Sequence, residues 1–272
     1  MRHPIAFSLT FPAGSAHIFG KETHVWRRAV TLPRRLRQIC KLFRLLPSAV
    51  FRRGLRHGVA ATVEHAAFFA SIAPDMVVDI GANKGQFALF VRDRFPHARI
   101  VSFEPMRKAA SRYARLFLGD TRTMLHPAAI GPDEGVANMY ISARDDSSSL
   151  LPIDALQTEL FPGTQEIGRE EVRVAPLSAF LTAEDIPADA LLKLDVQGFE
   201  LRALEGCDGL LSRFAWIYVE SSFVRLYEGQ ALADDVIAFL QARGFALSGI
   251  YNLAQDDKGR PIQADFTFTR RS

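Results

Sequence analysis

The sequence is poor in cysteine. Its 272 residues include two, Cys40 and Cys207, which lie far apart. Two isolated cysteines form neither the disulfide framework of a small secreted domain nor the close spacing of a metal site. We therefore expect a protein of a reducing compartment, the cytoplasm.

Long apolar runs are also missing. No segment reaches the ~18 consecutive apolar residues of a membrane-spanning helix. The apolar stretch 5–11 is short and no convincing cleavage site follows it, so we expect no signal peptide. The composition, 48% hydrophobic and 23% charged, suits one α/β domain of roughly 200 residues with an extension.

Acidic residues are almost absent from residues 1–60. This extension holds 12 Lys and Arg residues against a single acid, Glu22, whereas residues 61–272 hold 21 basic and 29 acidic residues. The net charge of +3 therefore combines a strongly basic N-terminal extension, residues 1–60, with a mildly acidic domain, residues 61–272.

The extension contains a predicted amphipathic helix from Thr31, a capping residue, to about Leu46. Its apolar stripe consists of Leu36, Ile39, Phe43 and Leu46 among many arginines. Two interpretations stay open. The stripe packs on the domain, or residues 31–56 contact an anionic membrane surface, at the inner face of the membrane.

The domain alternates strands and helices in the βαβ manner. Apolar runs predict strands at 76–80, 99–103, 190–196 and 215–220, and a further strand at 124–130 that Pro127 interrupts. Helices are predicted at 84–95, 107–118 and 234–243. Residues 245–251 and 264–269 predict a terminal antiparallel hairpin. We expect an α/β fold with a mostly parallel, seven-stranded sheet.

A glycine loop follows the first strand of this domain. Asp79 ends the strand, the loop carries Gly81, Asn83 and Gly85, and Glu104 ends the next strand. Glycine and asparagine permit left-handed backbone conformations and close approach of a ligand. Two acidic strand ends beside such a loop predict a nucleotide-sized site at the edge of a parallel sheet.

The loop differs from the pattern of nicotinamide dinucleotide sites. Gly-x-Gly-x-x-Gly is expected there, but Asn83 stands at the second glycine position and Gln86 at the third. Asp79 would also repel a pyrophosphate, whereas it would attract a sulfonium or an ammonium. S-adenosylmethionine therefore fits the loop better than a nicotinamide cofactor does.

Four segments resemble a known family. VVDIGANKGQF (77–87) resembles motif I of the class I S-adenosylmethionine-dependent methyltransferases. DSSSL (146–150), LLKLDVQGFE (191–200) and QADFTFTR (263–270) resemble the FkbM methyltransferases in particular. The resemblance covers about residues 74–270. It implies a Rossmann-like fold with an antiparallel last strand, and methyl transfer to a hydroxyl of a sugar, glycan or secondary metabolite.

The resemblance also assigns positions in the site. At the methionine end of the cofactor it places Asp79, Gly81, Ala82, Asn83 and Gly85. Glu104 would hold the ribose with Pro105 beside it, Ala128 and Ala129 would lie near the adenine, and Asp195 would face the methyl group.

Methyl transfer to a hydroxyl requires a proton acceptor. Asp195 is the predicted acceptor, and Glu220 and Glu200 are predicted to assist it by orienting the substrate. A divalent cation bound by these three carboxylates is the less favoured alternative, and we predict no metal site. Glu200 could instead stabilise the start of a helix, and Glu220 could cap an edge of the sheet.

The absence of one loop motif narrows the class of methyl acceptor that we expect. Methyltransferases of exocyclic base nitrogens usually carry an Asn/Asp-Pro-Pro-aromatic loop, where this chain has Asp195-Val196-Gln197-Gly198. A nucleic acid is thus an unlikely acceptor, despite the basic arm. Two alternatives stay open: a nucleic-acid methyltransferase that uses the arm, and a non-catalytic, membrane-associated protein of the same fold.

Overall fold

The structure is a computed structural model, and it describes residue 43 and residues 45–144 and 146–271. Cys40 and most of the predicted helix 31–46 lie outside the described residues. The first complete helix is α2 (Ala49–Arg56), which Ser48 caps by accepting a hydrogen bond from the Phe51 amide. Across the described ranges, no helix combines the length and the apolar character needed to cross a bilayer.

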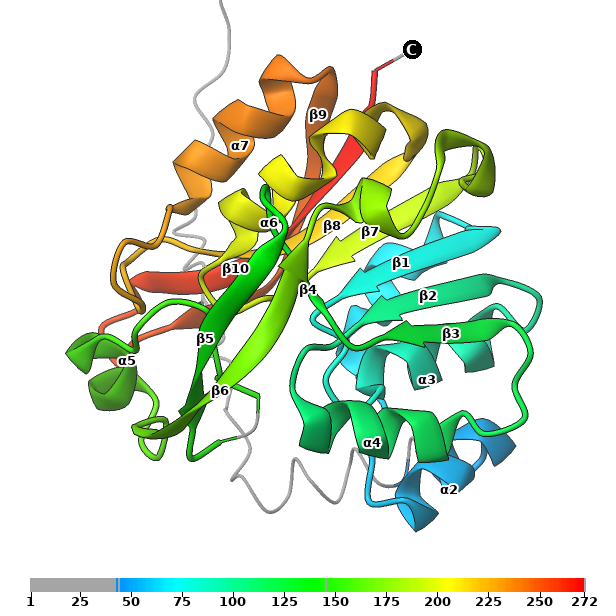
Figure 1. Cartoon of the computed structure of the whole chain (residues 1–272), viewed down its shortest axis with the longest axis horizontal. Coiled ribbons are helices and arrows are strands. Elements are labelled where there is room, and N and C mark those ends of the chain that lie inside the picture. The colour runs from blue at the N-terminus through cyan, green and yellow to red at the C-terminus, as the bar shows by residue number, and fades with distance from the viewer. Residues whose placement is uncertain (1–42, 44, 145, 272) are drawn as a thin grey trace, which may run out of the picture.

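Seven strands form the main sheet in the order β3-β2-β1-β7-β8-β10-β9 (Figure 1). The parallel strands are β1 (Met76–Ile80), β2 (Arg99–Phe103), β3 (Thr123–His126), β7 (Ala190–Leu194) and β8 (Trp216–Ser222). β9 (Phe245–Gln255) and β10 (Pro261–Arg270) form the predicted hairpin, and β10 is antiparallel to β8. The predicted seven-stranded sheet is confirmed.

Each face of the sheet is covered by its own group of helices. α3 (Gln86–Arg94), α4 (Arg107–Leu116) and the 3-10 helix η1 (Val63–Ala70) pack on one face. On the other face pack α6 (Glu200–Cys207), α7 (Ala233–Ala242) and the 3-10 helices η2 (Leu177–Ala179) and η4 (Asp208–Arg213). A further 3-10 turn, η3 (Ala183–Asp185), precedes β7.

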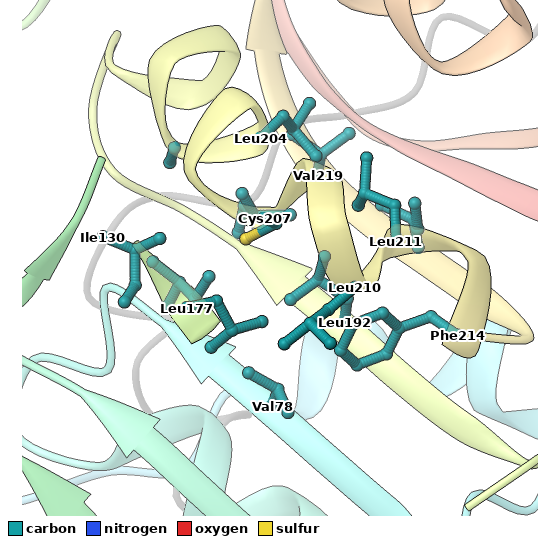
Figure 2. Close-up of a cluster of buried hydrophobic side chains, with 14 of the residues drawn as sticks. Val78, Ile130, Leu177, Leu192, Leu204, Cys207, Leu210, Leu211, Phe214 and Val219 are labelled. Carbon is teal, nitrogen blue, oxygen red and sulfur yellow. The ribbon is translucent and has the colours of Figure 1, made fainter. Parts of the chain in front are cut away.

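Successive residues of a strand point to opposite faces, so neighbours join different cores. Val77 packs with η1 and α3, whereas Val78 packs with the residues of α6 and η4. Figure 2 shows the second of these cores, in which Cys207 lies among leucines from the helices and the strands. Buried apolar strands of this kind hold the strand ends, and the loops after them, in fixed positions.

A second sheet of three strands was not predicted. It has the order β4-β6-β5, with β4 (Ala129–Ile130), β5 (Gly135–Ser142) and β6 (Glu166–Ala175), and α5 (Ala155–Leu160) lies between β5 and β6 in the chain. The prediction of one strand over 124–130 is wrong. Pro127 cannot donate to a strand ladder, so the chain leaves the main sheet there and continues as β4 in the second sheet.

Candidate active site

The loop after β1 turns sharply through left-handed residues. Gly81, Asn83 and Gly85 have φ of 82°, 48° and 90°, which confirms the predicted conformations. A Cβ at position 81 would lie 1.8 Å from the carbonyl oxygen of Asp195, so glycine allows the ends of β1 and β7 to touch. A Cβ at position 85 would instead meet the rings of Phe117 and Tyr113 at 2.8 and 3.1 Å. Gly85 therefore serves helix packing and does not line the cavity, contrary to its predicted role.

Glu104 fixes this loop from the end of β2. Its Oε2 accepts a hydrogen bond from the Asn83 amide and its Oε1 accepts one from the Met106 amide, each at 2.8 Å. The side chain is buried, and this burial raises the pKa of Glu104 from 4.5 to about 7. Each carboxylate oxygen retains a lone pair for a second donor, such as a ribose hydroxyl.

Asp79 forms a buried ion pair instead of lining the cavity. It is 0% exposed, and Lys193 Nζ lies 3.1 Å from its Oδ1 and 3.8 Å from Asp195 Oδ2. Burial lowers the pKa of Lys193, but Asp79 and Asp195 together raise it above the ordinary value. Lys193 lines the cavity, so the predicted contact of Asp79 with the cofactor is corrected to an influence through this lysine.

The turn after β7 is held in a strained conformation. Gln197 has φ 55°, unusual for a residue other than glycine, and Gly198 has φ 96°. A Cβ at position 198 would lie 2.7 Å from the Tyr227 ring. Glu200 Oε1 accepts hydrogen bonds from the amides of Val196 (3.2 Å) and Gly198 (3.0 Å). Glu200 is buried and does not line the cavity, so the structure assigns it to bracing this turn rather than to catalysis.

One amide group joins the two remaining predicted acids. Gln197 Nε2 donates to Asp195 Oδ1 at 2.7 Å and to Glu220 Oε2 at 2.9 Å. Gln263 Nε2, from β10, donates to Glu220 Oε1 at 3.0 Å. Burial raises the pKa of Glu220 well above 4.5, and the charges of Asp195 and Asp265 raise it further. Both carboxylates line the cavity.

A third carboxylate and a histidine lie beside this pair. Asp265 Oδ2 accepts hydrogen bonds from the Tyr218 hydroxyl and from Asn252 Nδ2, both at 2.7 Å. His65 Nδ1, from η1, lies 2.7 Å from the Tyr218 oxygen. Because the hydroxyl proton goes to Asp265, His65 Nδ1 is the donor in that contact.

Sequence reasoning missed this second group. Asp265 gave no clear signal, because it occupies a polar position of an alternating strand, in phase with Thr267 and Thr269, where an acid is expected to face solvent. His65 and Asn252 carried none, since only the fold brings η1 and β9 to the ends of β8 and β10.

A cavity of about 410 Å³ connects these groups. Its apolar wall includes Phe103, Ala128, Ala129 and Ile130, beside Pro105 and Ala82 of the predicted cofactor region. His126 is absent from this wall and instead stacks on Phe103, with ring centroids 5.1 Å apart. Ser147 and Ser148 complete the opposite side. The cavity lining therefore combines an apolar group around Phe103 and Ala128 with polar groups that include Asp195 and Glu220.

This donor set fits S-adenosylmethionine. The buried carboxylate of Glu104 retains acceptor capacity for ribose hydroxyls, and Asp195 supplies negative charge next to the loop that would receive a sulfonium. The described part of the chain contains no group of three or more His, Cys, Asp or Glu side chains arranged to hold a metal ion.

The order of the main sheet, its antiparallel β10, the glycine loop and Glu104 together define a class I methyltransferase fold. The family model of the methyltransferase FkbM domain matches residues 79–247, more than half of the chain. The chain therefore belongs to the FkbM methyltransferase family, and it is an S-adenosylmethionine-dependent methyltransferase.

Individual relatives are distant but share most of their length with this chain. Methyltransferase 1 of Beauveria bassiana is 25% identical over 63% of this chain and 72% of its own. The 2-O-methyltransferase NoeI of Sinorhizobium fredii is 27% identical over 66% and 77%. The 31-O-demethyl-FK506 methyltransferase FkbM of Streptomyces tacrolimicus is 25% identical over 71% and 77%.

Proposed function

We propose that this protein transfers a methyl group to a hydroxyl of a sugar, glycan or secondary metabolite. The observation that carries the proposal is the pair of cavity-lining carboxylates, Asp195 and Glu220, held together by Gln197. The names of two relatives, a 2-O-methyltransferase and a 31-O-demethyl-FK506 methyltransferase, support oxygen as the acceptor atom.

The same proposal assigns the donor end to the glycine loop and its neighbours in the cavity lining. Gly81, Ala82 and Asn83 would hold the methionine part, Glu104 the ribose, and Ala128 with Ala129 the adenine. When bound, S-adenosylmethionine supplies an electrophilic methyl group on a positively charged sulfur.

The protein's own contribution is to receive the hydroxyl proton. An alcohol is a very weak acid, so its oxygen becomes a good nucleophile only as a base removes the proton. Glu220 suits this task because its raised pKa makes its carboxylate a stronger base than an exposed glutamate. Asp195 lies closer to the loop, and we expect it to orient the hydroxyl and share the proton through the common hydrogen-bonded pair.

The test uses methyl-labelled S-adenosylmethionine with a panel of neutral sugars, oligosaccharides and alcohols. We expect a methyl ether, which survives mild base, whereas a methyl ester would be cleaved. Asp195→Asn and Glu220→Gln should each lower turnover by about 10²–10⁴-fold, the usual contribution of a general base, and leave S-adenosylhomocysteine binding largely intact.

Asp133→Asn is the matched control, because Asp133 is exposed and does not line the cavity. Full turnover in both cavity variants would remove these carboxylates as proton acceptors. A label recovered on nitrogen or in a base-labile ester would contradict the hydroxyl acceptor.

A further inference from the structure

The amide of Gln197 is held from both ends. Its Nε2 faces Asp195 and Glu220, as described, and its Oε1 accepts a hydrogen bond from the Tyr227 hydroxyl at 3.0 Å. If the amide rotated by half a turn, its oxygen would face two carboxylates and its nitrogen would face the hydroxyl proton. The two carboxylates therefore select this orientation. The Tyr227 hydroxyl reinforces it when its single proton is directed to Gln197 Oε1 rather than to the Ser147 carbonyl oxygen.

Tyr227 is well placed to impose this orientation. Its side chain is buried, and its ring packs against Gly198, the residue after Gln197. The backbone around it is clamped: the Asp154 amide donates to the Leu226 carbonyl oxygen at 3.0 Å, and the Glu228 amide donates to that of Pro152 at 2.9 Å. The hydroxyl group therefore cannot easily follow a movement of Gln197.

The hydroxyl also keeps its proton. Burial, together with the negative charges of Glu200, Glu220 and Asp195, raises the pKa of Tyr227 far above its ordinary value. Its second acceptor is the carbonyl oxygen of Ser147 at 3.1 Å, and Gln157 Nε2 donates to its oxygen at 3.4 Å. Ser147 and Gln157 line the cavity, so Tyr227 links these two lining residues to Gln197 through hydrogen bonds.

We propose that Tyr227 is a positioning residue that acts through Gln197, fixing the amide so that it donates to Asp195 and Glu220 and keeps both carboxylates oriented and ionised. The role rests on the proposed function, because only a proton-accepting pair needs this control. Glu200 also helps to fix Gln197, because it accepts hydrogen bonds from the Val196 and Gly198 amides on either side of it.

The experiment follows the carboxyl groups directly. The side-chain carboxyl carbons of aspartate and glutamate are labelled with carbon-13 in the full chain bound to S-adenosylhomocysteine, and their titration is followed by NMR. Asp195→Asn and Glu220→Gln assign the two signals. Tyr227→Phe removes one hydroxyl and should raise the pKa of Glu220 further, by about one pH unit, since its ionised form loses an oriented donor.

Two further variants separate positioning from a general loss of packing. Gln197→Met should give a rise of similar size, and Tyr227→Phe combined with Gln197→Met should give no more than either alone, because both act through one amide. Tyr113→Phe removes another buried hydroxyl, which is bonded to Ser102 at 2.7 Å and does not line the cavity, and it should leave the titration unchanged.

With an acceptor from the panel, Tyr227→Phe should lower kcat more than tenfold at unchanged KM for the methyl donor. An unchanged titration in Tyr227→Phe, or additive effects of the two substitutions, would overturn the proposal. If the titration shifts as expected but no methyl ether forms, the positioning contact stands and the proposed reaction fails.

Discussion

Two buried acids at this site, Asp79 and Glu104, have opposite electrostatic surroundings. Asp79 is neutralised by Lys193 inside the protein, whereas the buried carboxylate of Glu104 accepts from two amides and, among the described residues, forms no ion pair. Burial therefore raises the pKa of Glu104 to about 7. A carboxylate of this kind gains more from a bound ligand's hydroxyl donors than an exposed one does.

This property predicts a pH dependence of ligand binding. Ribose hydroxyls would favour the ionised form of Glu104, so the pKa should fall when the ligand binds. S-adenosylhomocysteine affinity should then increase by up to about tenfold per pH unit as the pH rises toward about 7, and level off above it. Titration calorimetry between pH 5.5 and 8.5 measures this slope.

Glu104→Gln should bind more weakly at pH 8 and lose the slope. Glu220→Gln should keep the slope, which makes this variant the control for a second cavity acid with a raised pKa. A slope that survives in Glu104→Gln would mean that another group takes up the proton.

At the residue scale, backbone conformations were easier to predict from the sequence than the partners of the charged side chains. Left-handed conformations at Gly81 and Asn83 follow from residue type alone. The ion pair between Asp79 and Lys193 joins strands that lie far apart in the chain, and Tyr227 meets Gln197 across another such interval. Contacts of this kind depend on the register of the sheet, which one sequence does not specify.

Among the elements, the turn after β7 concentrates the most constraints. Four of the six residues of Asp195–Glu200 line the cavity, namely Asp195, Val196, Gln197 and Phe199. Gln197 also bridges two acids, Gly198 makes room for the Tyr227 ring, and Glu200 accepts hydrogen bonds from two amides. Strain at Gln197 costs of order 1 kcal/mol and persists only because its neighbours hold it.

The bracing role of Glu200 is testable by two substitutions. Glu200→Gln keeps an acceptor oxygen and should lose less than about 1 kcal/mol of the free energy of unfolding. Glu200→Leu leaves the Val196 and Gly198 amides without their acceptor and should lose about 2–4 kcal/mol. Urea unfolding measures both. Loss of turnover in a stably folded Glu200→Gln would instead indicate that the carboxylate takes part in the chemistry.

The central strands β1 and β7 of the main sheet were predictable because they are buried on both faces. β1 and β7 are buried at every position and read as continuous apolar runs, apart from Asp79 and Lys193. β5 and β6 have few buried positions, and β6 carries five charged residues, so neither produces a clear apolar pattern. The second sheet escaped prediction for this reason, and with it the wall that carries Met139.

Across the whole molecule, the two sheets meet through α6. A Cβ at Gly206 of α6 would lie 2.4 Å from the Gly131 carbonyl oxygen, directly after β4. The backbones of α6 and the β4 segment are therefore in contact, with no side chain between them. Because Ala128, Ala129 and Ile130 form the apolar wall of the cavity, the distance between α6 and β4 also sets the width of the predicted adenine region.

Gly206→Ala should therefore affect stability and donor binding together. The added methyl group meets backbone atoms that cannot rotate away, and overpacking of this kind typically costs about 1–3 kcal/mol of the free energy of unfolding. S-adenosylhomocysteine affinity should fall as β4 moves. Gly209→Ala, three residues further on in η4, is the matched control, because a Cβ there meets nothing within 4 Å.

Urea unfolding and calorimetry on both variants measure the effects on stability and on S-adenosylhomocysteine affinity. Equal stability of the two variants would show that α6 and β4 separate without cost. A destabilised Gly206→Ala with unchanged affinity would show that β6 positions the wall of the cavity instead, through its pairing with Ala129 and Ile130.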